Sequence, residues 1–100
     1  MTNLSDGERD KLDAAAFRHL LRHLDQRKDV QNIDLMILAD FCRNCLGKWY
    51  KSSADDLGID ISAEQARDRI YGMPYTEWKQ KHQTSATHEQ LAALAARSKN

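Results

Sequence analysis

Three capping boxes punctuate the chain, and they constrain its fold more than any other feature of the sequence. In a capping box, a Ser or Thr and a Glu or Gln three residues later satisfy each other's free backbone amides at a helix start. The pattern occurs three times, at Ser5 with Glu8, Ser62 with Gln65, and Thr87 with Gln90. No run of alternating β-branched residues is long enough to make a strand. The sequence therefore predicts an all-α protein.

Apolar residues spaced three and four apart extend these signals into about five helices, two of them long. We expect the long helices at about 8–28 and 33–51, and the shorter ones at about 63–71, 74–83 and 87–97. Asn32 is suited to cap the second helix, and Pro74 suits a first helical turn. Residues 1–100 are expected to form a single helical domain with frayed ends at 1–7 and 97–100.

The charges are balanced, which argues against several classes of partner. The chain has 15 basic and 15 acidic side chains, and residues 1–31 carry six of each sign. A nucleic-acid-binding surface normally shows a basic excess, so nucleic acid is not an expected partner. No apolar run approaches the about 20 residues that span a bilayer, and the polar start MTNLSDGERD is unlike a signal peptide. We expect a cytoplasmic protein, with no membrane partner and with reduced thiols.

The two cysteines of the stretch FCRNC are the most distinctive motif. At about 100° per residue, the helix expected at 33–51 carries one apolar stripe made of Leu35, Leu38, Cys42, Cys45 and Trp49. Free cysteine packs as a small hydrophobic residue, so the stripe is predicted to lie in the core or in an interface. Other apolar residues cover much of the same helix, and a short chain buries limited surface alone. Both features favour a homodimer.

A zinc site is the alternative interpretation of the same two thiols. His19 and His23 lie four residues apart on the first helix and, with Cys42 and Cys45, offer four ligands of suitable chemistry. The cysteines of a symmetry-related chain could complete such a site instead. The histidines lie outside the face formed by the leucines of their helix, which favours thiols packed as apolar groups. We therefore expect no cofactor, with zinc as the alternative.

Other cysteine chemistries fit the sequence less well. A thioredoxin-like pair requires a helix start that follows a strand, whereas Cys42 is expected well inside a helix. Leu46 stands where a c-type haem motif has histidine. Phe41 stands where a zinc deaminase has proline, and the upstream motif of that enzyme class is absent.

Aromatic residues gather around a Gly-Met-Pro turn in RIYGMPYTEWK. Tyr71, Met73, Tyr75 and Trp78 fill the core on one interpretation and form a partner-binding patch on the other. The chain has no Gly-rich phosphate loop and no nucleophile elbow. Asp34 falls in the first turn of its expected helix, where a carboxylate offsets the helix dipole.

The stretches DVQNIDLMILADFCRNCLGKWY and YGMPYTEWK resemble the DUF1244 family of small bacterial proteins of unknown function. The resemblance runs from about Phe17 to Gln90. It implies a small, all-helical, oligomeric protein from a proteobacterium, without an established activity. Some members carry a deoxycytidine triphosphate deaminase label, which no residue of this sequence supports. The matching residues are Asp29 through Asp34, Phe41 through Cys45, Trp49, Tyr50, and Tyr71 through Trp78.

The function expected from the sequence is that of a non-enzymatic, cytoplasmic homodimer, a structural or interaction protein whose partner is a second copy of itself. A further protein partner is left open, and so is the zinc-binding alternative. An enzyme is also left open, provided that its site forms between subunits from Asp34, Arg43 and Tyr71.

Overall fold

The computed structural model describes residues 3–97, and within that range it is all-helical, without a strand. Its six helices are α1 (Asp6–Asp25), α2 (Asn32–Ala39), α3 (Arg43–Asp56), α4 (Ala63–Tyr71), α5 (Tyr75–His82) and α6 (His88–Arg97). The all-α prediction is confirmed, with six helices where about five were expected. Parts of the ends expected to fray belong to helices, because Asp6 and Gly7 begin α1 and Arg97 ends α6. The rest of those ends, residues 1–2 and 98–100, lies outside the described residues. None of the described helices is long and apolar enough to cross a membrane.

The capping boxes predicted from the sequence are all present. In the first, the Glu8 amide donates to Ser5 Oγ at 3.1 Å and the Ser5 amide donates to Glu8 Oε1 at 3.0 Å. The same reciprocal bonds join the other two pairs, Ser62 with Gln65 and Thr87 with Gln90. Helix α4 ends at Gly72, whose φ of 72° is the left-handed conformation common at helix C-termini. Local chemistry thus fixes where three of the helices begin.

The long helix predicted over 33–51 is divided in two, which corrects the sequence-based expectation. Asp40 ends α2 with a φ of 62°, in the left-handed region that Asp tolerates better than most residues. Cys42 then adopts an extended conformation with a φ of −149°, and α3 starts at Arg43. Because the chain leaves the helix at this point, positions that share a stripe on one continuous helix no longer share a face.

The core lies where α1, α2, α3 and α4 meet. Its buried cluster consists of Leu21, Leu24, Leu35, Cys42, Leu46 and Ile70. Helices α3 and α4 form the most extensively packed pair, while α5 packs on α4 and α6 on α2. The lack of a side chain at Gly47 lets α3 and α4 approach closely, since a Cβ there would lie 3.3 Å from Arg67 Cα.

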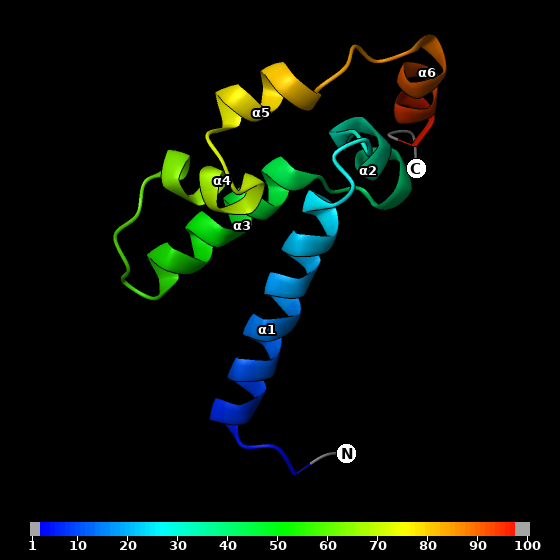
Figure 1. The fold of residues 1–100 in the computed structure, drawn as a ribbon. Coiled ribbons are helices and arrows are strands. Elements are labelled where there is room, and N and C mark those ends of the chain that lie inside the picture. The colour runs from blue at the N-terminus through cyan, green and yellow to red at the C-terminus, as the bar shows by residue number, and fades with distance from the viewer. Residues whose placement is uncertain (1–2, 98–100) are drawn as a thin grey trace.

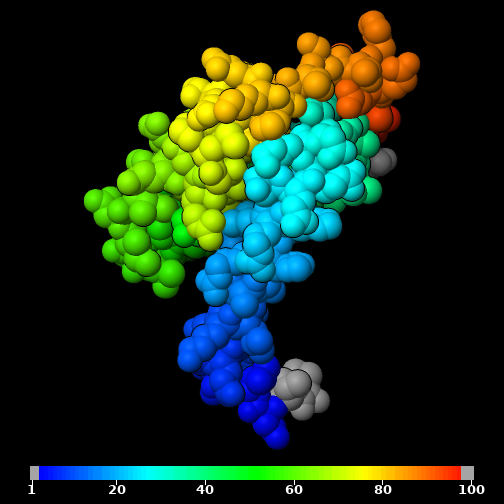
Figure 2. Space-filling view, in the orientation of Figure 1, coloured from blue at the N-terminus to red at the C-terminus, as the bar shows by residue number. Residues whose placement is uncertain are grey.

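Helix α1 projects from the body formed by the other helices (Figures 1 and 2). Every residue from 6 to 16 is exposed, and the chain becomes buried only in the second half of the helix. The molecule measures 48 × 34 × 25 Å, with a Cα radius of gyration of 15.9 Å. A compact domain of this length has a radius of about 13 Å. The chain is therefore more extended than its length requires.

Candidate functional site

The division between α2 and α3 places the two thiols at a helix start. Cys42 is the N-cap of α3, and its Sγ lies 3.9 Å from Cys45 Sγ. Both cysteines are free thiols. Cys42 is buried among core residues such as Leu21 and Leu35, and Cys45 packs against the same cluster. Burial raises the pKa of the Cys42 thiol. The position at a helix start suits redox chemistry, but a buried thiol with a raised pKa does not suit a nucleophile.

The structure does not assemble the four-ligand zinc site within one chain. Cys42 and Cys45 belong to the core, whereas His19 and His23 are exposed on α1. Over residues 3–97, no group of three or more His, Cys, Asp or Glu side chains could hold a metal ion. A zinc site that combines Cys42 and Cys45 with the same two cysteines of a second chain would require a dimer.

Arg43 is the first residue of α3, directly after the break between the helices, and it is buried, with only 2% of its surface exposed. Its Nη1 donates to the Val30 carbonyl oxygen at 2.7 Å and to Asn32 Oδ1 at 3.1 Å, and its Nη2 donates to the Arg27 carbonyl oxygen at 3.0 Å. The guanidinium also lies over the Trp78 ring, 5.0 Å from the centroid. Burial lowers the pKa of Arg43, but a guanidinium stays charged at neutral pH. Carbonyl oxygens after α1 therefore stabilise its charge, as at a helix C-terminus.

Tyr71 continues this polar network from α4. Its hydroxyl accepts a hydrogen bond from Asn32 Nδ2 at 2.9 Å and donates one to Asn44 Oδ1 at 2.7 Å. Burial raises the pKa of Tyr71 to about 12, so the neutral phenol persists. Asn32 was predicted to cap α2, but Gln31 is the N-cap, and the Asn32 side chain links Tyr71 to Arg43 instead. The network thus ties α2, α3 and α4 together.

Gln31 and Asp34 fasten the C-terminal part of the chain to α2. Gln31 Nε2 donates to the His82 carbonyl oxygen, and Gln31 Oε1 accepts from the Thr84 amide, each at 2.9 Å. Asp34 accepts from the Gln31 amide at 2.9 Å and from Gln90 Nε2 at 2.8 Å. Both carboxylate oxygens of Asp34 are therefore engaged in structural hydrogen bonds.

The aromatic cluster around the Gly-Met-Pro turn belongs mostly to the interior. Tyr71 and Trp78 are each 2% exposed, and Met73 and Tyr75 are half-buried. The Tyr71 ring centroid lies 4.9 Å from that of Trp78 and 5.0 Å from that of Tyr75. Tyr71 and Trp78 therefore pack in the interior, and the interpretation as a partner patch stays a prediction for the half-buried Met73 and Tyr75.

The stripe expected on a continuous helix is split between the core and the surface. Leu35 and Cys42 are buried and Cys45 is partly buried, whereas Leu38 is 81% and Trp49 57% exposed. The left-handed residue Asp40 turns α3 away from the line of α2, and within each of the two helices one member of the stripe faces the core while the other faces outward. Leu35 and Cys42 therefore contribute to core packing, and the exposed Leu38 and Trp49 are accessible to a partner.

A second group of rings forms what we call the aromatic face, defined by Phe17, Phe41, Trp49 and Tyr50. Phe17 of α1 stacks with Tyr50 of α3 at a centroid distance of 6.3 Å, and Phe41 stacks with Trp49 at 6.2 Å. Phe17, Trp49 and Tyr50 also line a small pocket of about 200 Å³. Trp49 and Tyr50 are the exposed rings of this face, while Phe17 and Phe41 pack partly against the core, and exposed aromatic rings are suited to a protein contact.

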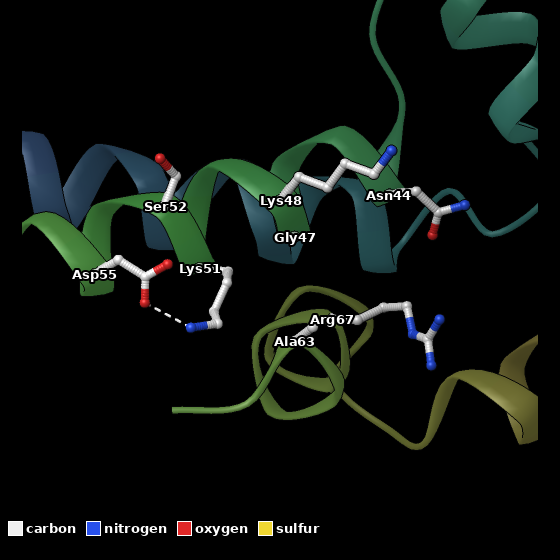
Figure 3. Close-up of a pocket in the computed structure, with 8 residues that line it drawn as sticks. All are labelled: Asn44, Gly47, Lys48, Lys51, Ser52, Asp55, Ala63 and Arg67. Atoms are coloured by element: carbon white, nitrogen blue, oxygen red, sulfur yellow. Dashed lines mark hydrogen bonds and ion pairs between the residues drawn. The ribbon is translucent and has the colours of Figure 1, made fainter. Parts of the chain in front are cut away.

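A pocket between α3 and α4 was missed by the sequence reasoning. Its volume is about 440 Å³, and Lys48, Lys51 and Arg67 are among its lining residues (Figure 3). The sequence spreads these residues over two helices and gives no local motif. The one available signal is Gly47, a glycine inside a helix, which often marks a close approach of two backbones.

Comparison with known proteins agrees with the resemblance seen in the sequence. The model of the family described as "Protein of unknown function (DUF1244)" matches residues 30–96, and the chain belongs to this family. No curated protein matches the sequence. The matched segment holds the thiol pair and most of the Arg43 network, and it leaves out the whole of the projecting helix α1.

Proposed function

We propose that this member of the DUF1244 family is a non-enzymatic, homodimeric helical protein that acts through protein contacts. The extent of its surface is the observation that carries the proposal. A folded monomer of 11.5 kDa exposes about 5,800 Å² by the usual scaling of surface with mass, whereas this chain exposes 7416 Å². The excess of about 1,600 Å² is larger than the about 800 Å² that each partner contributes to a standard interface.

The projecting half of α1 and the aromatic face are the surfaces that we assign to the dimer contact. Residues 6–16 are exposed along the whole first half of α1, and Leu12 is 55% exposed. The aromatic face begins where this half ends, because Phe17 is both the first partly buried residue of α1 and a member of the face. One continuous surface thus joins a projecting helix to a set of open rings.

A second copy of the chain is the occupant that we favour for this surface. A two-fold interface uses the same patch on both subunits. The projecting helix of each subunit can therefore pack on the aromatic face of the other. Aromatic residues are enriched at such interfaces, and burying them contributes more than burying charged surface. The area available on one chain is also sufficient for a stable dimer.

The residues that an enzyme site would require support a structural assignment instead. Asp34 is bonded through both of its oxygens, and Arg43 donates to backbone carbonyl groups. Tyr71 is buried and hydrogen-bonded to two asparagines. These three side chains use their polar atoms to hold helices together, which leaves them without free groups for chemistry.

Sedimentation velocity on the full chain and on two charge-introducing variants tests the proposal. Trp49→Lys places a charge in the aromatic face, and we expect it to convert the dimer to a monomer with unchanged circular dichroism. Leu91→Lys is the matched control, because Leu91 is 52% exposed on α6, outside the aromatic face. The control is expected to stay dimeric. A monomeric unmodified chain, or equal dissociation of both variants, contradicts the assignment.

Zinc bound between two copies is the second candidate, and one distance favours it. Two thiolates on one tetrahedral zinc, each at about 2.3 Å, lie about 3.8 Å apart. Cys42 Sγ and Cys45 Sγ are 3.9 Å apart, so the pair already has a chelating spacing. The burial of Cys42 in the core favours simple packing. Zinc analysis of protein purified without chelators decides, since one zinc per dimer would support the shared site.

A further inference from the structure

The pocket between α3 and α4 has a composition that the dimer proposal does not use. Its wall is formed by the two helices that pack most closely, and its volume is about 440 Å³. Small-molecule sites range from about 300 to 1,000 Å³, so the pocket could hold a metabolite of modest size. Figure 3 shows Asn44 and Arg67 at one end of the pocket and the pair formed by Lys51 and Asp55 at the other.

The pocket is cationic. Lys48, Lys51 and Arg67 stand against a single carboxylate, that of Asp55, among the lining residues. Lys51 Nζ and Asp55 Oδ1 are paired at 2.5 Å, which leaves the charges of Lys48 and Arg67 without a carboxylate partner among residues 3–97. Two cations uncompensated in one pocket favour the binding of a dianion.

Arg67 is the residue that points most directly to a ligand. Its guanidinium lies on the Tyr75 ring, with Cζ 4.5 Å from the centroid, and this contact fixes the orientation of the group. Its Nε is buried and has no hydrogen-bond partner. A buried donor without an acceptor costs about 1–3 kcal/mol, and because Nε is closed to solvent, a small shift of the side chain is needed for an anion in the pocket to reach it.

Asn44 brings a neutral donor to the same end of the pocket. Its Oδ1 accepts a hydrogen bond from the Tyr71 hydroxyl at 2.7 Å, which orients the amide group. This bond leaves the Nδ2 donor of the amide directed away from Tyr71, and no described residue accepts a hydrogen bond from it. A fixed amide donor beside a fixed guanidinium is a suitable arrangement for anionic oxygens.

We propose that the α3–α4 pocket binds a small phosphate monoester, with Arg67 and Asn44 contacting the phosphate group and Lys48 adding a positive charge at the same end of the pocket. A phosphate monoester carries nearly two negative charges at neutral pH and matches the two unpaired cations. The planar guanidinium provides a forked contact to two phosphate oxygens, and the lysine adds a point charge. The remaining volume, toward Ser52 and Ala63, accommodates the organic part.

Amide chemical-shift titration of the full, isotope-labelled chain tests this site at constant ionic strength. The probes are glycerol 3-phosphate, inorganic phosphate and, as a carboxylate dianion of similar size, succinate. Saturable shifts centred on Gly47 and Arg67 with glycerol 3-phosphate are expected, with weaker binding of inorganic phosphate and the weakest of succinate. Equal or tighter binding of succinate overturns the phosphate assignment, and shifts that do not saturate overturn the site.

Three variants separate the pocket from general charge attraction. Lys48→Gln is expected to weaken glycerol 3-phosphate binding about fivefold, because it removes one of the two positive charges of the pocket that have no carboxylate partner. Arg67→Gln should weaken it further, although this change also removes the contact with Tyr75. Because Lys48 is exposed, Lys48→Gln is expected to stay folded. It therefore tests the site even if Arg67→Gln is destabilised. Lys79→Gln, an exposed lysine of α5, is the control, and equal weakening by this variant contradicts the proposal.

Discussion

Replacement of Arg43 by Met tests whether the buried guanidinium is the structural centre of this fold. Methionine keeps much of the length of the side chain but removes every donor. The change leaves the carbonyl oxygens of Val30 and Arg27, now bonded to Arg43 at 2.7 and 3.0 Å, without those donors. It also removes the bond to Asn32 and the contact with Trp78. All of these losses fall where α1, α2 and α3 meet.

The expected cost follows from the balance of two effects at Arg43. The Val30 carbonyl oxygen would lose its donor at a cost of about 1–3 kcal/mol, whereas the Arg27 carbonyl oxygen keeps a bond from the Val30 amide at 3.1 Å. The variant no longer has to bury a charge, which offsets part of this loss. We expect a net destabilisation of about 1–3 kcal/mol, an appreciable fraction of the about 5–15 kcal/mol that stabilises a typical domain.

Urea denaturation followed by circular dichroism measures this difference, at one fixed protein concentration because the proposed dimer would make stability depend on concentration. Arg43→Lys is the matched control. It keeps the charge but loses the forked geometry, so it should fall between the unmodified chain and Arg43→Met. If Arg43→Met costs less than about 1 kcal/mol, the guanidinium is not the structural centre that its contacts indicate.

The remaining predictions concern three other groups. Burial raises the pKa of Tyr71 from 10.0 to about 12, so stability from its neutral phenol is present below pH 10 and declines as the pH rises toward 12. In an absorbance titration of the phenolates, Tyr71→Phe should lose the step near pH 12. A titration unchanged by this substitution would contradict the burial of the Tyr71 hydroxyl. Replacing both Cys42 and Cys45 by Ala should cost about 1–3 kcal/mol in urea denaturation and leave the oligomer intact. Collapse of the fold in that variant would instead indicate a bound metal. Trp49→Lys should abolish the dimer at unchanged helicity, as sedimentation velocity can show.

Features encoded by local chemistry could be predicted from the sequence. The capping boxes gave the starts of their helices, and α4 has the predicted bounds of 63–71. Capping depends on side chains within one turn, so it does not require knowledge of the tertiary structure. The apolar periodicity was less reliable, because Leu35 and Cys42 of the expected stripe are buried whereas Leu38 and Trp49 are exposed.

The break between α2 and α3 could not be predicted, because the apolar periodicity runs through it. A single left-handed residue, Asp40, interrupts the helix while the sequence on either side keeps a helical pattern. The break lets Arg43 reach the end of α1, a contact between residues far apart in the chain. Arginine is seldom fully buried, so nothing in the sequence marks Arg43 as an interior residue. The pocket and the aromatic face depend on this same tertiary arrangement.

Native mass spectrometry of untagged protein, purified without chelators, tests the central claim of a homodimer most directly. The account predicts a complex of twice the 11.5 kDa chain mass without bound metal. The same instrument reads the stoichiometry of zinc, so a dimer with one metal ion would support the shared thiolate site instead. A monomer at concentrations where the protein is otherwise stable would contradict the account, because the projecting helix and the aromatic face would then have no second copy to cover them.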